Sequence, residues 1–437
     1  MKLIPKEFSK FPGILNNKCR FASYDILIAA SLHLVSAFLI LHTKGLSYQD
    51  LNKGSFFINV KTGDVLICDN DNVSSGGEGN SAKIKGMQGY MAPEIVTKKV
   101  THPNTETDRH SLAVVLFLLF IHQHPLYGKK VAEGDGMPDP KIFEGTDPVF
   151  IFDPQNKSNR PTLPEHKGAD ANWGVLPNYI QELFVKAFGD GLKEPAKRPT
   201  DGQWQKTLLK FRDEYIGDQC PNPSCSGGNL SDSKIIHIQC KKCGKTFDQP
   251  ARFKCGDFIV PLLPGKKFYV YHIDKSTDIS TADYMAVVGE IIASKKTPNI
   301  FGIKNLSKDT WNVAAPNGEN KEVKSNEVVS IKGGSEIIFK NMTGQIVFQL
   351  STDKYTISLY PSQKVYAYDK TGNKKLIAEV IQSKKNPRKW GLKNLSSEVW
   401  IYKSVWGETG KVKPDEVMSV ARGCQVNFGS MSGRITG

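Results

Sequence analysis

A repeated block of sequence sets the strongest constraint on the fold. Residues 289–311 (GEIIASKKTPNIFGIKNLSKDTW) align with residues 378–400 (AEVIQSKKNPRKWGLKNLSSEVW) at an offset of 89 residues, and about half of the aligned positions are identical. Alternating Val, Ile, Phe and Tyr, broken by Gly, Asn and Pro, is typical of β-strands and turns. The block therefore predicts two tandem all-β modules, over residues 264–350 and 361–437, with a short junction at 348–362.

Composition places the chain among ordinary globular proteins, with a basic excess at one end. The sequence has 437 residues, 39% of them hydrophobic and 23% charged, and this length suggests about three domains. The formal net charge is +14, and residues 264–437 carry 26 Lys and Arg against 16 Asp and Glu. Lysine pairs at 295–296 and 384–385 precede turn prolines in both copies. Nucleic acid is therefore one partner class to weigh, although solvated turn lysines give the same pattern.

Two apolar runs, residues 25–41 and 111–123, predict buried helices. The first is interrupted by Ser31, His33 and Ser36, and the second is shorter than the about 20 residues that a membrane-spanning helix needs. The N-terminal stretch MKLIPKEFSKFPG has no apolar signal core. We expect a cytoplasmic protein without membrane contact, whose eight cysteines are reduced thiols or metal ligands.

Four cysteines in a short segment predict a structural zinc site. Cys220 and Cys225 form the first pair, and Cys240 and Cys243 form a C-x2-C knuckle. Four thiolates surround and neutralise a tetrahedral Zn²⁺, which replaces the core that so small a module lacks. The spacing indicates a four-cysteine zinc ribbon over residues 218–258. Because four thiolates close the coordination shell, no position is left for catalysis.

Acidic residues flank an apolar hairpin in the N-terminal half. Asp50 precedes a predicted strand over residues 56–60, and a second strand over residues 65–68 leads to Asp69 and Asp71. Such a hairpin holds its first and last carboxylates at one rim of a pocket. Phosphoryl transfer needs one carboxylate to orient a hydroxyl and another to hold magnesium on the phosphates. Turn capping is the simpler role for carboxylates at strand ends, so other motifs must decide.

Three more motifs follow in order. The stretch GMQGYMAPE, residues 86–94, ends in an Ala-Pro-Glu triplet with Glu94. The stretch TDRHSLAVVLFLLFIHQHPL places Asp108 at the start of an apolar helix, and KEPAKRPT contains Arg198. Together with the acidic hairpin, these motifs resemble the C-terminal lobe of a protein kinase over residues 1–217. We therefore expect a multidomain α+β chain with a mainly α kinase-like lobe, the zinc ribbon and the two all-β modules.

The resemblance implies a role for each residue of the acidic hairpin. Asp50 matches the catalytic-loop Asp that orients the substrate hydroxyl, and Asp69 matches the Asp that binds Mg²⁺ with ATP. Asp71 is placed to share the metal. Ser55 stands where a second metal-binding Asn is expected, and its neutral hydroxyl is a weaker magnesium ligand.

The remaining motif residues are expected to hold the fold. The resemblance implies that Arg198 pairs with Glu94 and that Asp108 has a structural role, as all three would in an inactive relative. Tyr48 and Gln49 stand where His-Arg is usual, so the Arg that responds to activation-loop phosphorylation is missing.

The resemblance begins at or just past the hinge between the two kinase lobes. No Gly-rich loop and no strand Lys precede Asp50, and these parts supply positioning and charge in phosphoryl transfer. The sequence therefore predicts a serine/threonine protein kinase-type protein whose small lobe is absent and whose activity, as written, is impaired or lost. Two other functions stay open: a pseudokinase scaffold that assembles partners through the zinc ribbon and β modules, and a basic nucleic-acid-binding protein.

Two wider resemblances extend this interpretation. The phrases SYQDLN, GDVLICDNDNV and DPVFIFDPQNKSNRP resemble bacterial kinases encoded beside tellurite-resistance genes. That family implies stress signalling on Ser or Thr with two partners, a von Willebrand A-type protein and a metal-dependent protein phosphatase. The second half of each β module resembles a forkhead-associated sandwich, which implies phosphothreonine recognition. The Arg, Ser and His that usually form the binding loops are not evident in either copy.

Overall fold

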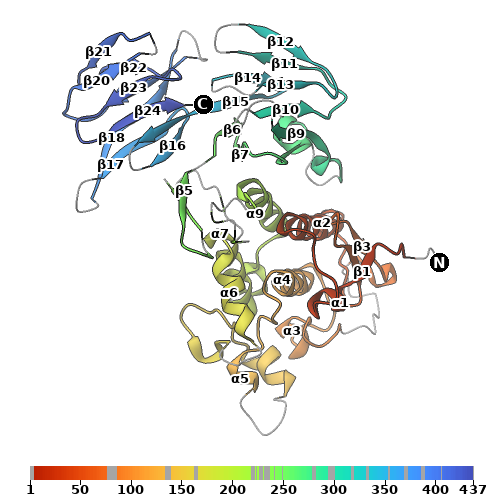
Figure 1. Cartoon of the computed structure of the whole chain (residues 1–437). Coiled ribbons are helices and arrows are strands. Elements are labelled where there is room, and N and C mark those ends of the chain that lie inside the picture. The colour runs from red at the N-terminus through yellow and green to blue at the C-terminus, as the bar shows by residue number, and fades with distance from the viewer. Residues whose placement is uncertain are drawn as a thin grey trace. The chain divides into compact units, whose positions relative to one another are not determined.

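The chain folds into two compact units, Met1–Arg212 and Asp213–Gly437. The computed structural model describes residues 4–75, 86–132, 139–161, 166–217, 222, 224, 225, 230, 237–240, 242–248, 250–277, 282–293, 301–315, 319–330, 334–352, 355–368, 373–384, 389–404 and 406–436. Figure 1 shows helices dominating the first unit and strands the second, so the mixed helix and sheet class is as predicted.

The first unit is mainly helical. Its elements are β1 Phe8–Lys10, α1 Phe11–Leu15, α2 Tyr24–Thr43, β2 Phe56–Asn59, β3 Val65–Ile67, η1 Asn70–Asn72, α3 Pro93–Val96, α4 Thr105–Ile121, α5 Lys129–Ala132, η2 Lys141–Thr146, η3 Lys157–Asn159, α6 Lys167–Val175, α7 Asn178–Phe188, α8 Asp190–Lys193, η5 Pro195–Lys197 and α9 Asp201–Glu214. The strands β1, β2 and β3 form a small antiparallel sheet in that order.

Helix α4 forms the centre of this unit and packs against α2, α6 and α7. It begins with a capping box, in which the Asn104 side chain accepts from the Thr107 N–H at 3.1 Å and the Thr107 hydroxyl accepts from the Asn104 N–H at 2.8 Å. Its core face carries Phe117, whose ring contacts those of Phe150 and Phe184. The apolar run that the sequence shows is therefore a buried helix.

Helix α2 is capped at its N-terminus by Ser23, whose hydroxyl accepts from the Ile26 N–H at 3.4 Å. By length and composition it is the one helix among the described residues that is apolar enough to cross a membrane. Leu27, Ile28 and Val35 are nevertheless buried within the first unit. The same test is passed by core helices of globular proteins, so α2 gives no evidence for a membrane.

The turn between β2 and β3 depends on a glycine. Gly63 has φ +83°, and a Cβ placed there would lie 2.9 Å from both the Ala29 Cβ and the Ile26 carbonyl oxygen. Only glycine fits this close approach to α2 without strain. The turn therefore fixes the hairpin against helix α2. Asp50 precedes this hairpin and Asp69 follows it.

The second unit holds a short hairpin and a pair of β sandwiches. The hairpin is β4 His237–Gln239 with β5 Thr246–Asp248. The other elements are β6 Arg252–Cys255, β7 Phe258–Pro261, β8 Lys267–Tyr269, α10 Val270–Ile273, η6 Ala282–Met285, β9 Val287–Ala293, β10 Phe301–Asn305, β11 Trp311–Ala314, β12 Asn320–Val323, β13 Val328–Ser330, β14 Glu336–Ile338, β15 Thr343–Thr352, β16 Thr356–Leu359, β17 Lys364–Tyr368, β18 Lys374–Gln382, β19 Trp390–Asn394, β20 Trp400–Lys403, β21 Thr409–Val412, β22 Val417–Ser419, β23 Gln425–Asn427 and β24 Ser432–Thr436.

The two sandwiches share one strand order. In the first, a sheet β13-β10-β9-β8 faces a sheet β12-β11-β14-β15-β6-β7. In the second, a sheet β22-β19-β18-β17 faces a sheet β21-β20-β23-β24-β15-β16. Trp311 and Trp400, at equivalent positions of the repeat, are buried in the two separate cores. The sequence repeat is thus a repeat of structure.

Strand β15 belongs to both sandwiches, which corrects the predicted junction. Its first half pairs with β6, from Gly344 to Val347, and its second half pairs with β24, from Gln349 to Thr352. Leu350 lies in the second core. The segment 348–362 is therefore not a linker, because its alternating apolar residues form β15 and β16 of the second sandwich.

Two predicted boundaries also move. Residues 252–258, expected at the end of the zinc ribbon, form β6 and the start of β7, and Cys255 is buried in the first sandwich. The helical unit ends within α9 instead of at residue 217. The Asp213 carboxylate accepts hydrogen bonds from the Tyr271 hydroxyl at 2.5 Å and from His272 Nε2 at 3.0 Å, so this end of α9 belongs to the second unit.

Candidate functional site

Asp108 holds the backbone that leads into Asp50. It lies in the first turn of α4, where the helix dipole favours a negative charge, and it is 2% exposed. Its Oδ2 accepts the Tyr48 N–H at 2.5 Å, and its Oδ1 accepts the Gln49 N–H at 2.9 Å. The two carboxylate oxygens therefore fix the two residues that precede Asp50, which makes Asp108 a positioning residue for this site.

A buried imidazole supports Asp108 from behind. His42, near the end of α2, has Nε2 at 3.2 Å from the Asp108 Oδ2 and Nδ1 at 2.7 Å from the Asp201 Oδ2. Burial lowers the pKa of His42, but hydrogen bonds to Asp108 and Asp201 outweigh burial and raise the pKa to about 9. His42 is therefore a cation between two carboxylates at neutral pH.

The Asp50 carboxylate is half-buried and held in place by two donors. The Asn52 Nδ2 donates to the Asp50 Oδ1 at 3.0 Å and to its carbonyl oxygen at 3.0 Å, and the Met87 N–H also donates to the carboxylate. Burial raises the pKa of Asp50, the bonds from Asn52 and Met87 oppose the rise, and the charge of Asp69 adds to it. Asn52 is thus a site residue that the sequence interpretation missed.

The charge of Asp69 contributes to the raised pKa of the Asp50 carboxyl. Asp69 is exposed and has φ +56°, in the left-handed region that residues other than glycine seldom adopt. Gln49, directly before Asp50, also has a positive φ, +72°. Backbone strain of this kind gathers at functional sites, and here it lies at Asp69 itself and at the residue before Asp50. Asp71 lies in η1, exposed, two residues beyond Asp69.

A hydroxyl links the two ends of the acidic hairpin. Tyr48 is buried, and its hydroxyl donates to the carbonyl oxygen of Cys68, the residue before Asp69. Burial raises the pKa of Tyr48, so the hydroxyl keeps its proton. The Tyr that replaces the expected His therefore ties the segment carrying Asp50 to the one carrying Asp69.

The Ser55 hydroxyl is engaged in hydrogen bonds within the loop that follows Asp50. It donates to the Asp50 carbonyl oxygen at 2.8 Å and accepts the Asn52 N–H at 3.0 Å, and the residue is 1% exposed. These contacts close the loop between Asp50 and β2. A role for Ser55 as a second magnesium ligand stays a prediction.

Arg198 and Glu94 form a buried ion pair. The Arg198 Nη1 donates to Oε1 at 2.6 Å and Nη2 donates to Oε2 at 2.7 Å, a bidentate geometry. The guanidinium also donates to the carbonyl oxygens of Gly191 at 2.8 Å and Glu106 at 2.9 Å. These two residues lie 104 positions apart, and the kinase resemblance implies them as partners. Their contacts join α3 to α8 and to the first turn of α4.

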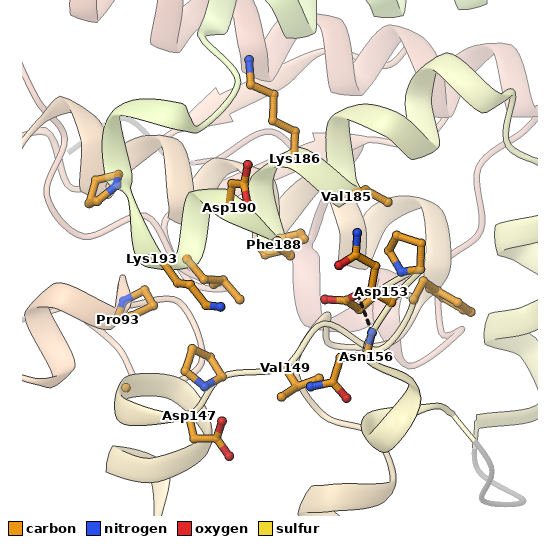
Figure 2. A pocket seen from close by; sticks show the side chains of 18 of the residues that line it. Pro93, Asp147, Val149, Asp153, Asn156, Val185, Lys186, Phe188, Asp190 and Lys193 are labelled. Carbon is orange, nitrogen blue, oxygen red and sulfur yellow. Dashed lines mark hydrogen bonds between the residues drawn. The ribbon is translucent and has the colours of Figure 1, made fainter.

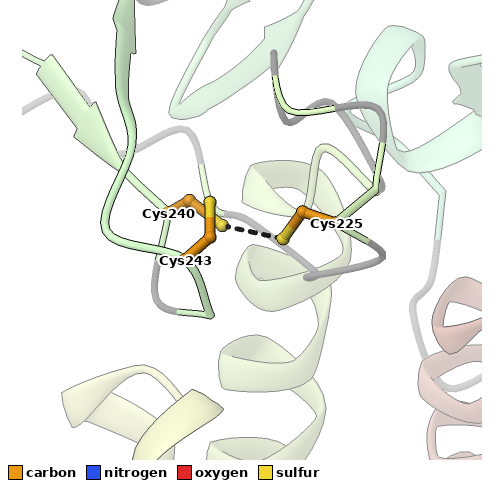
Figure 3. A group of neighbouring side chains, drawn as sticks. All are labelled: Cys225, Cys240 and Cys243. Atoms are coloured by element: carbon orange, nitrogen blue, oxygen red, sulfur yellow. Dashed lines mark hydrogen bonds between the residues drawn. The ribbon is translucent and has the colours of Figure 1, made fainter.

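Three of the four predicted zinc ligands gather at one point (Figure 3). The sulfur atoms of Cys225, Cys240 and Cys243 lie within 4.8 Å of one another, with Cys225 and Cys240 at 3.6 Å. Cys220 lies outside the described residues. Burial raises the pKa of Cys240, but hydrogen bonds from the Cys243 and Lys242 N–H groups outweigh it and lower the pKa to about 6. Such a thiolate knuckle suits a soft divalent metal.

The first unit also contains a hollow that neither Asp50 nor Asp69 lines. A cavity of 1340 Å³ lies between α3, residues 145–160, α7 and α8, and Figure 2 shows carboxylates and amines on its walls. Asp153, Asp190 and Lys193 are among its lining residues, whereas Asp50 and Asp69 are not. Mixed charges give this hollow no single preference for a ligand, and it is separate from the acidic site.

The comparison with protein families agrees with the acidic site. Residues 9–165 match the model of the protein kinase domain. No curated protein matches the chain. The matched segment holds Asp50, Asp69, Glu94 and Asp108, whereas Arg198 and the whole second unit lie beyond it. Residues 9–165 of this chain are therefore protein kinase-like.

Proposed function

We propose that the first unit carries out phosphoryl transfer from Mg-ATP to a Ser or Thr hydroxyl of a protein. One observation carries this proposal: the hydroxyl of Tyr48, two residues before Asp50, donates to the carbonyl oxygen of Cys68, the residue before Asp69, and so joins the two segments that carry these carboxylates. In the transfer, the bond from the γ-phosphorus to the ADP oxygen breaks, a bond to the substrate oxygen forms, and the hydroxyl proton passes to Asp50.

The residues present fit a magnesium ion. Asp69 offers an exposed carboxylate on a strained backbone, and the exposed Asp71 lies two residues away. Mg²⁺ is commonly held by one or two carboxylates together with substrate phosphates, and it neutralises the charge of those phosphates. Asp50 has the complementary task of orienting the hydroxyl, and the bonds from Asn52 and Met87 hold its carboxylate for that task.

To test this proposal, the chain is incubated with Mg-ATP and a protein acceptor. Mass spectrometry then measures the phosphate incorporated into the acceptor. We expect Asp50→Asn to lower transfer by about a hundredfold or more, because it removes the proton acceptor. Asp64→Asn is the matched control, since Asp64 lies exposed on the same hairpin and its carboxylate accepts from the Thr62 hydroxyl. Equal transfer by both variants, or none by the unaltered chain, would contradict the proposal.

A pseudokinase scaffold is the second candidate, and one observation favours it. The Ser55 hydroxyl donates to the Asp50 carbonyl oxygen and accepts the Asn52 N–H, so it is engaged within its loop. Binding of Mg-ATP without phosphate transfer would favour the scaffold.

We further propose that the cysteine cluster binds a structural Zn²⁺. The three sulfur atoms within 4.8 Å of one another support this, and Cys220 is the fourth ligand that the spacing offers. The metal would hold the β4–β5 hairpin to the segment with Cys225. Metal analysis of the purified chain tests the assignment, with one equivalent of zinc expected.

The β sandwiches are proposed to bind partners of a bacterial stress-signalling system. Their two-sheet architecture supports the resemblance to a forkhead-associated fold. A von Willebrand A-type protein and a metal-dependent protein phosphatase are the two partner classes that the sequence resemblance implies, in the cytoplasm. A pull-down experiment tests this role. Each purified partner is mixed with the full chain and, separately, with a chain that lacks residues 213–437. The lysine pairs lie outside the described residues except for Lys384, so they add no support for nucleic acid.

A further inference from the structure

One sheet of the second sandwich carries exposed cations on its outer face. In its strands β20, β21, β23 and β24 (Figure 1), alternate residues enter the core, namely Trp400, Val412, Val426 and Ile435. The residues between them point outward. Lys403, Lys411 and Arg434 are the charged residues at these outward positions, and all three are exposed. None of the described residues in these four strands is acidic. We call this surface the basic face.

Strand register brings the three cations of the basic face near one another. Ile401 pairs with Lys411 and Lys403 pairs with Thr409, so the two lysines are diagonal neighbours with Cα atoms about 7–8 Å apart. Lys403 pairs with Gln425, which pairs in turn with Arg434, so Arg434 lies about 10 Å from Lys403. Within the part of the chain that the structure describes, none of the three cations has an ion-pair partner.

The first sandwich shows that this fold does not require cations on the face. At the offset of 89 residues, the positions of the three cations are taken by Ala314, Glu322 and Gln345. Glu336 likewise stands in place of Gln425, and the strand pairing is the same in both copies. One copy thus has two carboxylates at the outward positions where the other has three cations. Because both copies fold alike, the cations are free to serve binding.

An exposed indole stands at one end of the basic face. Trp406 is 86% exposed and lies in the turn between β20 and β21, three residues after Lys403. The Ser404 N–H donates to the Glu408 carbonyl oxygen at 2.7 Å and closes this turn. The first copy has Asn317 at the position of Trp406, so a turn of this kind does not need an indole.

Apolar carbon adjoins the cations on the same face. Ile401, between Lys411 and Asn427 in the register, is 53% exposed, and Val399 is 48% exposed. The basic face therefore offers positive charge, exposed aliphatic surface and one flat aromatic ring. Glu408 is the one acidic residue of the adjacent turn.

A single strand of nucleic acid matches this combination. Its phosphates bind exposed cations, and every base has a flat face that stacks on an aromatic ring, whatever the sequence. The bases of a duplex are already stacked on each other, so an indole at the edge of a sheet does not reach their faces. An acidic protein segment would neutralise the cations, but its carboxylates offer no flat surface to Trp406.

We propose that the basic face together with Trp406 binds single-stranded nucleic acid. Phosphates of the strand contact Lys403, Lys411 and Arg434, one base stacks on Trp406, and Ile401 packs against the sugars. The site lies in the second unit, uses residues other than the repeated lysine pairs, and does not depend on phosphoryl transfer by the first unit.

The first test measures binding and its salt dependence. The full chain is titrated into a fluorescein-labelled oligothymidylate of about 12 nucleotides, without ATP, and anisotropy is recorded between about 50 mM and about 200 mM salt. Three phosphate contacts on a single strand predict a slope of about −2 for log K against log salt concentration. No binding at the lowest salt concentration would overturn the inference.

Removing two cations should weaken binding and flatten its salt dependence. Lys403→Gln combined with Lys411→Gln leaves one contact, so the slope should change to about −0.7 and the affinity at low salt should fall by more than about tenfold. The matched control is Lys321→Gln with Lys324→Gln, because these lysines are exposed in the first sandwich and their loss changes the net charge equally. Equal weakening by the two double variants would overturn the inference, since it would show attraction to any basic chain.

The indole is tested separately from the charges. Trp406→Ala should weaken binding by about tenfold with the salt slope unchanged, because stacking releases no counterions. Trp406→Phe should restore most of the affinity, and neither change should lower Tm, since the side chain is exposed. Unaltered affinity in Trp406→Ala would overturn the proposed stacking site.

Competing ligands identify the occupant. An oligouridylate of the same length replaces the DNA in one titration, and tighter binding of either polymer supports the proposal and names RNA or DNA as the natural ligand. Duplex DNA and a polyglutamate peptide are the other competitors. Tighter binding of the duplex would overturn the assignment to single strands. Equal displacement by polyglutamate in the unaltered chain and in Trp406→Ala would assign the face to an acidic protein segment instead.

Discussion

His42 and Asp201 lie 159 positions apart in the chain, yet the His42 Nδ1 is 2.7 Å from the Asp201 Oδ2. The other ring nitrogen faces Asp108, which holds the backbone N–H groups of Tyr48 and Gln49. The Arg109 Nε also lies 3.7 Å from the Asp201 carboxylate. One imidazole therefore joins α2, α4 and α9 behind the proposed catalytic loop, and its charge matters for the fold.

The stability of the chain should fall in alkaline solution because His42 loses its proton. Its pKa is raised from 6.5 in the unfolded chain to about 9 when folded, so its contribution is complete below about pH 6.5 and is lost as the pH rises through about 9. The contribution amounts to about 3 kcal/mol. Urea unfolding between pH 6 and 10 measures this contribution. In His42→Gln, the free energy of unfolding should fall less between neutral and alkaline pH. If the free energy of unfolding falls with pH just as steeply in His42→Gln, another group causes the alkaline loss of stability.

Breaking the Glu94–Arg198 pair should destabilise the first unit strongly. Glu94→Gln leaves a buried guanidinium without its counter-charge, and the free energy of unfolding should fall by about 3–5 kcal/mol. Arg198→Lys should cost a similar amount, since a single ammonium cannot form the bidentate contact. A cycle with the double variant isolates the coupling energy, and additive losses in that cycle would show that the two residues act independently.

Removing the hydroxyl of Tyr48 should disturb Asp69 more than the fold. Tyr48→Phe keeps the buried ring and loses the bond to the Cys68 carbonyl oxygen, so we expect a loss of about 1 kcal/mol of stability. The binding of Mg-ATP should weaken severalfold, because the strained backbone at Asp69 loses a support. Tyr402→Phe, in the second sandwich, is the matched control and should leave nucleotide binding as it is. Unaltered nucleotide binding in Tyr48→Phe would contradict the proposed link.

Loss of one cysteine should release the proposed zinc ion. Cys243→Ser replaces an exposed thiol and leaves the fold of both sandwiches in place, so the bound zinc should fall from about one equivalent to below a tenth. Cys424→Ser is the control, since Cys424 is buried in the second core and far in sequence from the cluster. Retention of zinc by Cys243→Ser would show that this thiol is not a ligand.

Much of the first unit follows from ordered motifs, because each motif carries its own chemistry. Asp50, Asp69, Glu94 and Arg198 are identified by local sequence, and the structure places them in one unit. The contacts made by His42 and Asn52 leave no such signal, since a His near a helix end and an Asn in a loop are common. The sequence does not show the hydrogen bonds of the Ser55 hydroxyl either, because a Ser at this position can bind a metal or form hydrogen bonds within its loop.

The second unit shows the same limit on a larger scale. The repeat predicts two β modules because alternation and turns recur at a fixed offset. Alternation does not reveal pairing partners, however, and a strand used by two sheets looks like any other strand. The second half of β15 and strand β16 therefore read as a junction, although Leu350, Ile357 and Leu359 lie in the core of the second sandwich.

The most direct test of the account is the thermal unfolding of the chain with and without Mg-ATP. A ligand that binds only the folded state raises Tm, and at a hundredfold excess over Kd the gain is about 2.7 kcal/mol. We predict a clear rise in Tm for the unaltered chain and for Asp64→Asn, and no rise for Asp69→Asn. An equal rise in Asp69→Asn, or no rise in the unaltered chain, would contradict the claim that Asp50 and Asp69 form a site for Mg-ATP.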